Sequence, residues 1–159
     1  MFSTNTYGKI GSVISKVVRF AVLACLGAAA ACSNSPTTPS ASAPYSQVDL
    51  RLGTGTEATT GTSVTLNYTG WLYDPSQPDG KGLLFDTSVG KTALTFKLGS
   101  GQVIQGFDRG VTGMKVGGAR RIVIPPSLGY GSSRNNSIPP YATLVFEVDL
   151  LDVAAASGS

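Results

Sequence analysis

The sequence predicts an α+β domain in which an antiparallel sheet packs against one short helix. Two hydrophobic periods support this prediction. Several segments alternate apolar and polar residues, as half-buried strands do, whereas one segment has apolar residues three and four positions apart, as a helix does. Turn-forming residues, among them many of the twenty glycines, separate the segments. One short helix on an antiparallel sheet is an α+β arrangement.

Strand character recurs along the chain from residue 45 to residue 153. The clearest case is "TSVTLNYTGWLY" (residues 62–73), which alternates apolar and polar side chains. Further strands are predicted at "VDLRL", "LTFKL", "RRIVI" and "TLVFEVDLL". Turns are predicted between Gly80 and Gly82 and again around Gly90.

The helical segment carries a single apolar stripe, formed by Ile104, Phe107, Val111 and Met114. Gly106 and Gly110 lie within this segment, and glycine weakens an isolated helix by about 1 kcal/mol relative to alanine. We therefore expect the two glycines to allow a close approach between this helix and the sheet.

The N-terminus resembles an export signal. A basic region ending in "KVVR" precedes the apolar run "FAVLACLGAAAA", which has the length of a signal-peptide core. A membrane-spanning helix needs about 20 apolar residues, and Lys16 and Arg19 interrupt any longer window. Residues 1–31 are therefore predicted to be a lipoprotein-type signal peptide.

Cys32 is the predicted lipidation site, because "LGAAAAC" resembles the lipobox of bacterial lipoproteins. Ala29 departs from that motif, which usually has Leu, Val or Ile at this position. Cys25 is a competing site with a shorter apolar core. The expected location is extracytoplasmic, in the periplasm or on the cell surface, with a lipid anchor in the membrane. Ordinary cleavage at an Ala-x-Ala site, giving a soluble secreted protein, is the alternative.

Composition divides the rest of the chain into three parts. Residues 32–44 form an uncharged Ser/Thr/Pro-rich tether, residues 45–153 the domain, and residues 154–159 a disordered tail. Three of the twelve Lys and Arg precede Cys32, which leaves nine against nine Asp and Glu. This balance argues against nucleic acid as a partner. Both cysteines also precede the domain, so no disulfide is expected in it.

Four blocks of the domain are together more specific than any single motif. They are "VTLNYTGWL", "LLFDTS", "FKLGSGQVIQGFDRGVTGMKVGGARRIVIPPSLGYG" and "IPPYATLVFEVDLL". In this order they resemble the FKBP-type peptidyl-prolyl cis-trans isomerases, over almost all of residues 48–153. The resemblance implies a twisted antiparallel sheet of five to six strands wrapped around one short helix. It also implies an enzyme that accelerates rotation about X-Pro bonds.

The resemblance implies ten site residues by position. Those implied in catalysis are Tyr68, Asp86, Ile104 and Tyr130. Those implied in substrate binding are Phe85, Phe96, Val103, Phe107, Ile138 and Phe146. Several positions depart from the family. Phe107 replaces a frequent tryptophan, and Leu94 replaces an aromatic at the rim. The basic residue that often accompanies the aspartate is represented at best by Lys91, in a loop of different length. The stretch "SSRNNS" and the longer segment "YDPSQPDGKGLL" also differ.

The chemistry expected of such a site requires no nucleophile, metal or cofactor, which suits a chain without histidine. The barrier to amide rotation is about 18–20 kcal/mol because resonance gives the C–N bond double-bond character. A dry aromatic pocket favours the twisted amide, which separates less charge than the planar one. The expected partners are proline-containing exported polypeptides, and the expected inhibitors are the macrolides tacrolimus and rapamycin.

Two other interpretations stay open on the sequence alone. The domain could be an FKBP-like chaperone or binding module with little isomerase activity. Without the four blocks, Phe96, Phe107 and Phe146 would be interpreted as ordinary core residues, and Asp86 as a turn former. A protease-coupled assay on a short proline peptide separates an isomerase from a binding module.

Overall fold

The computed structural model describes residues 42–155. The predicted signal peptide, Cys32, most of the tether and the last four residues lie outside this range. Within residues 42–155, six strands form one antiparallel sheet. They are β1 (Ser46–Arg51), β2 (Ser63–Tyr73), β3 (Lys81–Thr87), β4 (Leu94–Lys97), β5 (Ala119–Ile124) and β6 (Leu144–Ala154).

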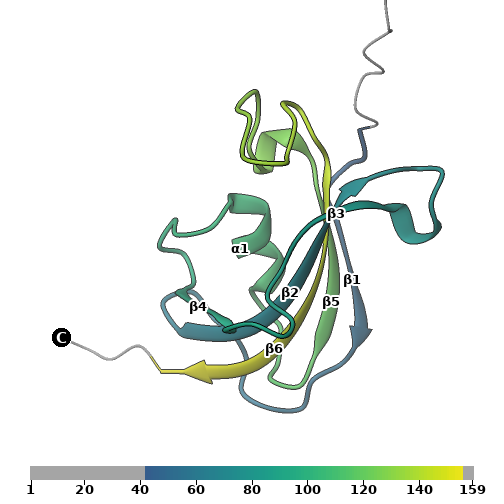
Figure 1. Ribbon diagram of the computed structural model, residues 1–159. Coiled ribbons are helices and arrows are strands. Elements are labelled where there is room, and N and C mark those ends of the chain that lie inside the picture. Colours follow the sequence, from purple (N-terminus) through teal and green to yellow (C-terminus); the bar gives the residue numbers. More distant parts are fainter. Residues whose placement is uncertain (1–41, 156–159) are drawn as a thin grey trace, which may run out of the picture. The chain divides into compact units, whose positions relative to one another are not determined.

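The strand order in the sheet is β1-β5-β6-β2-β3, with β4 beside β2 off this path (Figure 1). The long strand β2 has two neighbours along one edge: its first half pairs with β4, and its second half pairs with β3. Along its other edge, β2 pairs with β6 over almost its whole length. The predicted antiparallel sheet of five to six strands around one helix is thus confirmed.

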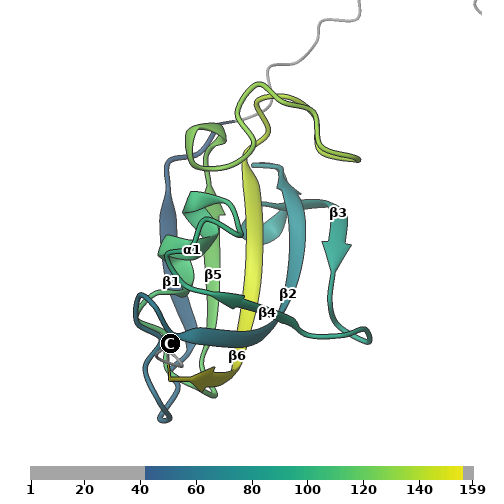
Figure 2. The ribbon, with the colours of Figure 1, turned by 90° about the vertical axis from the view of Figure 1, so that its left-hand side faces the viewer.

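The described residues contain one α-helix, α1 (Gln105–Val111), which lies against the concave face of the sheet, as Figure 2 shows from the helix side. A Cβ atom on Gly106 would collide with Ile124, and one on Gly110 would collide with Ile122. The two glycines therefore let the helix backbone lie directly on β5, as the sequence predicted. The stability of this short helix therefore comes from its packing on the sheet rather than from the weak helix propensity of its sequence.

Polar contacts fix both ends of α1. The carboxylate of Asp108 accepts the backbone N–H of Gly99 at 3.0 Å. At the C-terminal end, the buried guanidinium of Arg120 donates to the carbonyl of Gly110 at 2.9 Å and to Asp49 of β1 at 2.6 Å. A cation near the last carbonyl groups complements the helix dipole. Arg120 thereby connects the helix to two strands.

Two local predictions need correction. The turn expected between Gly80 and Gly82 ends at Gly80, and Gly82 already belongs to β3. Gly82 is small for a packing reason, since a Cβ there would lie 2.8 Å from the Asp74 Cβ atom. The apolar helical stripe also outlasts the helix, because Met114 lies in the turn after α1 and is nevertheless buried.

Two connections carry short 3₁₀ turns, η1 (Pro78–Gly80) and η2 (Pro126–Leu128). The main core lies between α1 and the concave face of the sheet. No helix within residues 42–155 has the length and apolar character needed to cross a membrane.

Candidate active site

Four phenylalanines and a tyrosine form a continuous aromatic cluster between α1 and the sheet. Phe107 of α1 and Phe146 of β6 lie at its centre, with ring centroids 5.1 Å apart and planes at 78°. Tyr68 of β2 contacts both rings edge-on, at 6.0 and 6.1 Å. Phe85 packs on Phe146 at 5.5 Å. Such edge-to-face contacts hold rings in fixed orientations.

A cavity of about 390 Å³ opens above this cluster. Its lining consists of Tyr68, Phe85, Asp86, Leu94, Gly101, Gln102, Val103, Ile104, Phe107, Tyr130 and Phe146. Asp86 is the only charged side chain in the lining. A concave apolar site with a few convergent polar groups is the usual form of a ligand-binding site.

A β-bulge explains why two consecutive residues of β3 both line the cavity. Gly70 pairs with Asp86, whereas the next residue of β2, Trp71, pairs with Leu84. Phe85 is therefore the extra residue of the bulge. In a regular strand, Phe85 and Asp86 would point to opposite faces of the sheet.

Gly70 supplies the space for the bulged residue. A Cβ atom at this position would lie 2.6 Å from Phe85 Cζ and 2.9 Å from Phe146 Cε1. Both rings thus lie directly on the backbone of β2. Any larger side chain here would push one wall of the cavity outward.

Tyr68 and Asp86 form the polar pair of the site. The Tyr68 hydroxyl donates a hydrogen bond to Asp86 Oδ2, while Asp86 Oδ1 accepts the backbone N–H of Thr87 at 2.8 Å. Lys91 Nζ lies 3.9 Å from Asp86 Oδ1. Burial, followed by the hydrogen bond to Asp86 and its charge, raises the pKa of Tyr68 to about 12. The phenol is therefore protonated at neutral pH.

The segment before α1 forms the opposite wall. Val103 and Ile104 lie at the start of the helix, and the Ile104 carbonyl accepts the N–H of Phe107 at 3.0 Å. Within the described residues, the Ile104 N–H donates to no protein group. The Gln102 side chain accepts the N–H of Lys97 at 2.9 Å and so fixes the loop that leads to the wall.

Eight of the ten predicted residues line this cavity. The other two lie beside it. Phe96 is buried behind the lining and packs on Phe107 with ring centroids 6.1 Å apart. Ile138 borders an adjoining hollow of about 300 Å³, together with Asn135, Asn136 and Ser137. That hollow shares Phe85, Asp86 and Tyr130 with the main cavity.

Sequence reasoning missed Gly101 and Gln102, which also line the cavity. Both precede Val103 in "GSGQVI", so their nearness to a predicted site residue was an available signal. Gln102 is polar and acts through backbone contacts, a role that no periodic pattern indicates.

Comparison with known proteins identifies the family of the chain. The sequence profile of the FKBP-type peptidyl-prolyl cis-trans isomerases matches residues 54–151. An FK506-binding protein of Neisseria meningitidis serogroup B is 48% identical over 107 residues, which cover 66% of this chain and 92% of the relative. The peptidyl-prolyl cis-trans isomerase FKBP15-3 of Arabidopsis thaliana is 46% identical over 99 residues, covering 62% and 65% of the two chains.

Two solved structures are similar in fold. FkpA from Escherichia coli has a TM-score of 0.59 and 38% identity, over 70% of this chain and 49% of FkpA. This chain therefore spans about half the length of FkpA. AtFKBP13 has a TM-score of 0.59 and 32% identity, over 69% of this chain and 93% of AtFKBP13. On its sequence blocks, its sheet and helix, and these relatives, the chain belongs to the FKBP-type peptidyl-prolyl cis-trans isomerase family and is an isomerase of X-Pro bonds.

Proposed function

We propose that the aromatic cavity binds the proline ring of an exported polypeptide and accelerates rotation about the X-Pro bond by excluding water. The observation that carries this proposal is the floor of the cavity. Phe107 and Phe146 are 3% and 5% exposed, and the one carboxylate in the lining, that of Asp86, is engaged with Tyr68. A proline bound here would meet rings on one side and few free polar groups.

The rate gain follows from the difference between the planar and the twisted amide. A planar amide is more polar, so water stabilises it, whereas an apolar cavity stabilises it less. The twisted transition state loses resonance and charge separation, and the cavity favours it relative to the ground state. An acceleration of about 10⁵-fold corresponds to about 7 kcal/mol of such differential stabilisation.

Two hydrogen-bond donors at the cavity would orient the substrate carbonyls. The Ile104 N–H is free of protein partners in the described residues, and the Tyr130 hydroxyl belongs to the lining. Asp86 would hold Tyr68 in place and face the carbon of the rotating amide. Phe85 and Val103 would contact the proline ring from the sides. Phe96 would support Phe107 from behind, and Ile138 would contact the substrate beside proline.

The test is a protease-coupled assay on a short proline peptide with matched variants. Tyr130→Phe should lower kcat/KM about fivefold, the equivalent of one neutral hydrogen bond. Asp86→Asn should lower it about tenfold, because a charged acceptor is lost. Tyr73→Phe, on the opposite face of the sheet, is the control and should leave the rate unchanged. Equal rates in all three variants would contradict these roles.

Macrolide inhibition is part of the same proposal. The Neisseria relative is named as an FK506-binding protein, and FK506 is tacrolimus. Tacrolimus and rapamycin should therefore compete with the peptide in the cavity. Leu94 at the rim and the "SSRNNS" loop should weaken both. Normal isomerase activity with no inhibition at all would show that the rim does not accept macrolides.

We also propose that the protein is extracytoplasmic and is anchored in a membrane by a lipid on Cys32. This location rests on the sequence before the domain. A lipoprotein cysteine carries more than one acyl chain, and two chains suffice for durable attachment. A Cys32→Ser variant should move to the soluble fraction, or accumulate unprocessed, with full isomerase activity. Attachment lost in Cys25→Ser instead would assign the anchor to Cys25, and an unlipidated mature protein would remove the anchor altogether.

A further inference from the structure

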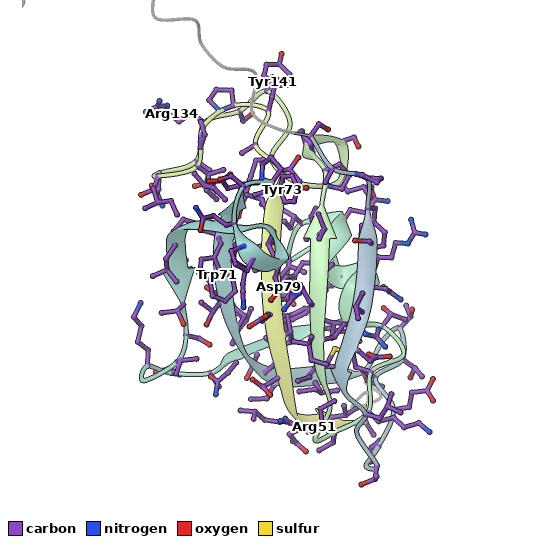
Figure 3. The ribbon with its side chains drawn as sticks, turned by 90° about the vertical axis from the view of Figure 1, so that its right-hand side faces the viewer. Arg51, Trp71, Tyr73, Asp79, Arg134 and Tyr141 are labelled. Carbon is purple, nitrogen blue, oxygen red and sulfur yellow. The ribbon has the colours of Figure 1, made fainter. Side chains whose placement is uncertain are left out.

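The connection between β2 and β3 folds over the outer face of the sheet, which is the face opposite α1. We call this connection, residues 74–80, the strap. Figure 3 views the outer face and shows Trp71 and Asp79 lying over it. The carboxylate of Asp79 reaches Arg121 of β5, with 2.7 Å between Oδ1 and Nη1. The strap therefore contacts a strand that lies beyond both β2 and β6 in the sheet order.

The strap has a defined internal structure. Asp74 Oδ1 accepts both the backbone N–H and the hydroxyl of Ser76, at 2.9 and 2.7 Å. The N–H of Asp74 donates to the carbonyl of Gly80 at 3.0 Å and closes the loop. Gly80 packs on the ring of Tyr73, where a Cβ would lie 2.5 Å from Cε2. These contacts make the strap a compact turn with its own shape.

The outer face also holds a network of ion pairs. Glu147 of β6 accepts from Lys81 at 2.9 Å and from Arg121 at 2.9 Å. The three side chains are only 28%, 27% and 19% exposed for Lys81, Glu147 and Arg121. Lys81 Nζ also lies 5.1 Å from the centre of the Trp71 ring. Val145 of β6, two residues before Glu147, is fully buried although it lies outside the main core.

This network ends on the strand that carries part of the cavity wall. Lys81 is the first residue of β3, and β3 pairs with β2 alone in the described chain. The register of that pairing shifts twice, so its ladder of hydrogen bonds is irregular. An edge strand with a broken ladder is held weakly by backbone bonds alone.

Side chains hold the other end of β3 as well. The buried Ser88 hydroxyl accepts the N–H of Tyr68 at 2.9 Å and donates to Asn67 at 3.0 Å. The Thr87 and Thr69 hydroxyls are also hydrogen-bonded to each other at 3.0 Å. Phe85 and Asp86 therefore lie between the side-chain attachments at Thr87 and Ser88 and the attachment at Lys81.

We propose that the strap and the ion network of Asp79, Lys81, Arg121 and Glu147 position Phe85 and Asp86 from the far side of the sheet. They hold β3 against β2 and so set the width of the cavity. These four residues are positioning residues, since none of them lines the cavity. The proposal rests on the roles proposed above for Phe85 and Asp86.

The experiment compares four single variants in the full-length chain. Lys81→Met and Arg121→Met each remove one cation of the network, while Lys81→Arg preserves it. Arg51→Met is the matched control, because it removes an exposed ion pair with Asp149 that does not contact β3. Trp71 is the only tryptophan of the chain, so its fluorescence reports directly on the network.

We expect Lys81→Met and Arg121→Met to change the Trp71 emission and to lower kcat/KM about fivefold, mainly through a higher KM. The KM should rise because a displaced Phe85 widens the cavity. A variant that merely loses folded protein would show a lower apparent kcat and an unchanged KM. Lys81→Arg should restore both readouts, and Arg51→Met should alter neither.

Two results would overturn the proposal: a changed Trp71 emission with an unchanged KM, or an equal rise of KM in Arg51→Met. Phe85→Leu separates this failure from failure of the proposed site. If Phe85→Leu raises KM and Lys81→Met does not, the site stands and the positioning role is wrong. If Phe85→Leu leaves KM unchanged, the role proposed for Phe85 is itself wrong.

Discussion

The two faces of β2 and β6 are built from different chemistry. Toward α1, the rings of Tyr68 and Phe146 make edge-to-face contacts with Phe107 and form the floor of the cavity. On the opposite face, one residue further along β6, Glu147 binds Lys81 and Arg121. In the proposed mechanism the inner face excludes water around the twisting amide, whereas ion pairs on the outer face connect β3, β6 and β5. One sheet thus separates an aromatic surface from a charged surface.

The largest expected effect comes from the inner face. Phe146→Ala removes a ring that is 5% exposed and contacts three other aromatic rings. Loss of a buried phenylalanine costs about 3–5 kcal/mol. The neighbouring change Glu147→Gln should cost about 1–2 kcal/mol, because its partly exposed ion pairs keep one hydrogen-bonding group. Urea denaturation of the two variants measures both losses in the free energy of unfolding. Equal losses would contradict the difference expected between the inner and the outer face.

Gly70→Ala tests whether the inner face tolerates a single added methyl group. The new Cβ would collide with Phe85 and Phe146, at 2.6 and 2.9 Å in the present geometry. Overpacking of this kind costs about 1–3 kcal/mol of stability. Activity should fall about tenfold because both rings form the cavity wall. Peptide isomerisation and denaturation curves on the same preparation check this, and unchanged activity would show that the rings relax without disturbing the site.

The two faces should lose stability at opposite ends of the pH scale. Tyr68 has its pKa raised from 10.0 to about 12, so its contribution is complete below pH 10 and is lost as pH rises toward 12. Burial would raise the pKa of Glu147, but the hydrogen bonds from Lys81 and Arg121 lower it below 4.5 overall. Its contribution is complete above pH 4.5 and is lost as pH falls through the lowered pKa.

Unfolding curves measured across the pH range should therefore show a loss of stability at alkaline pH and another at acid pH. Tyr68→Phe should reduce the alkaline loss, and Glu147→Gln should reduce the acid loss. Burial also raises the pKa of Tyr45, so part of the loss of stability at alkaline pH should persist in Tyr68→Phe. The assignment would be wrong if Tyr68→Phe abolished the loss of stability at acid pH. It would also be wrong if Glu147→Gln abolished the loss at alkaline pH.

The smallest expected effect is that of pH on catalysis between pH 6 and 8. The chain has no histidine, and rotation about an amide transfers no proton. The isomerase rate should be flat over this range. A bell-shaped profile would show that a titrating group takes part in the reaction, and the mechanism of water exclusion would then be incomplete.

The sequence predicted the inner face well, because its residues follow periods that one chain displays by itself. The alternation in residues 62–73 and the stripe from Ile104 to Met114 identified a strand and a helix facing one core. Gly106 and Gly110 indicated the close contact with the sheet. The family blocks then implied which of these apolar residues lie together at the site.

The outer face and the bulge were not predictable in this way. Asp79 and Arg121 are far apart in sequence and resemble ordinary surface charges, so nothing local indicates that they meet. The bulge at Phe85 depends on the pairing partner rather than on strand propensity. One signal was available: Val145 is apolar at an outward position of β6, which indicates that something covers it.

The position of β6 also bears on how the domain is made. This last strand of the described chain lies at the centre of the sheet, hydrogen-bonded to β5 on one side and to β2 on the other. Before residues 144–154 have emerged from the ribosome, β5 and β2 have no shared neighbour and Phe107 has no Phe146 to pack on. Pairings between distant segments form late and slowly in folding. We therefore expect the sheet to be completed only once residues 144–154 are available. A truncation that removes β6 would leave two separate groups of strands, β1 with β5, and β2 with β3 and β4.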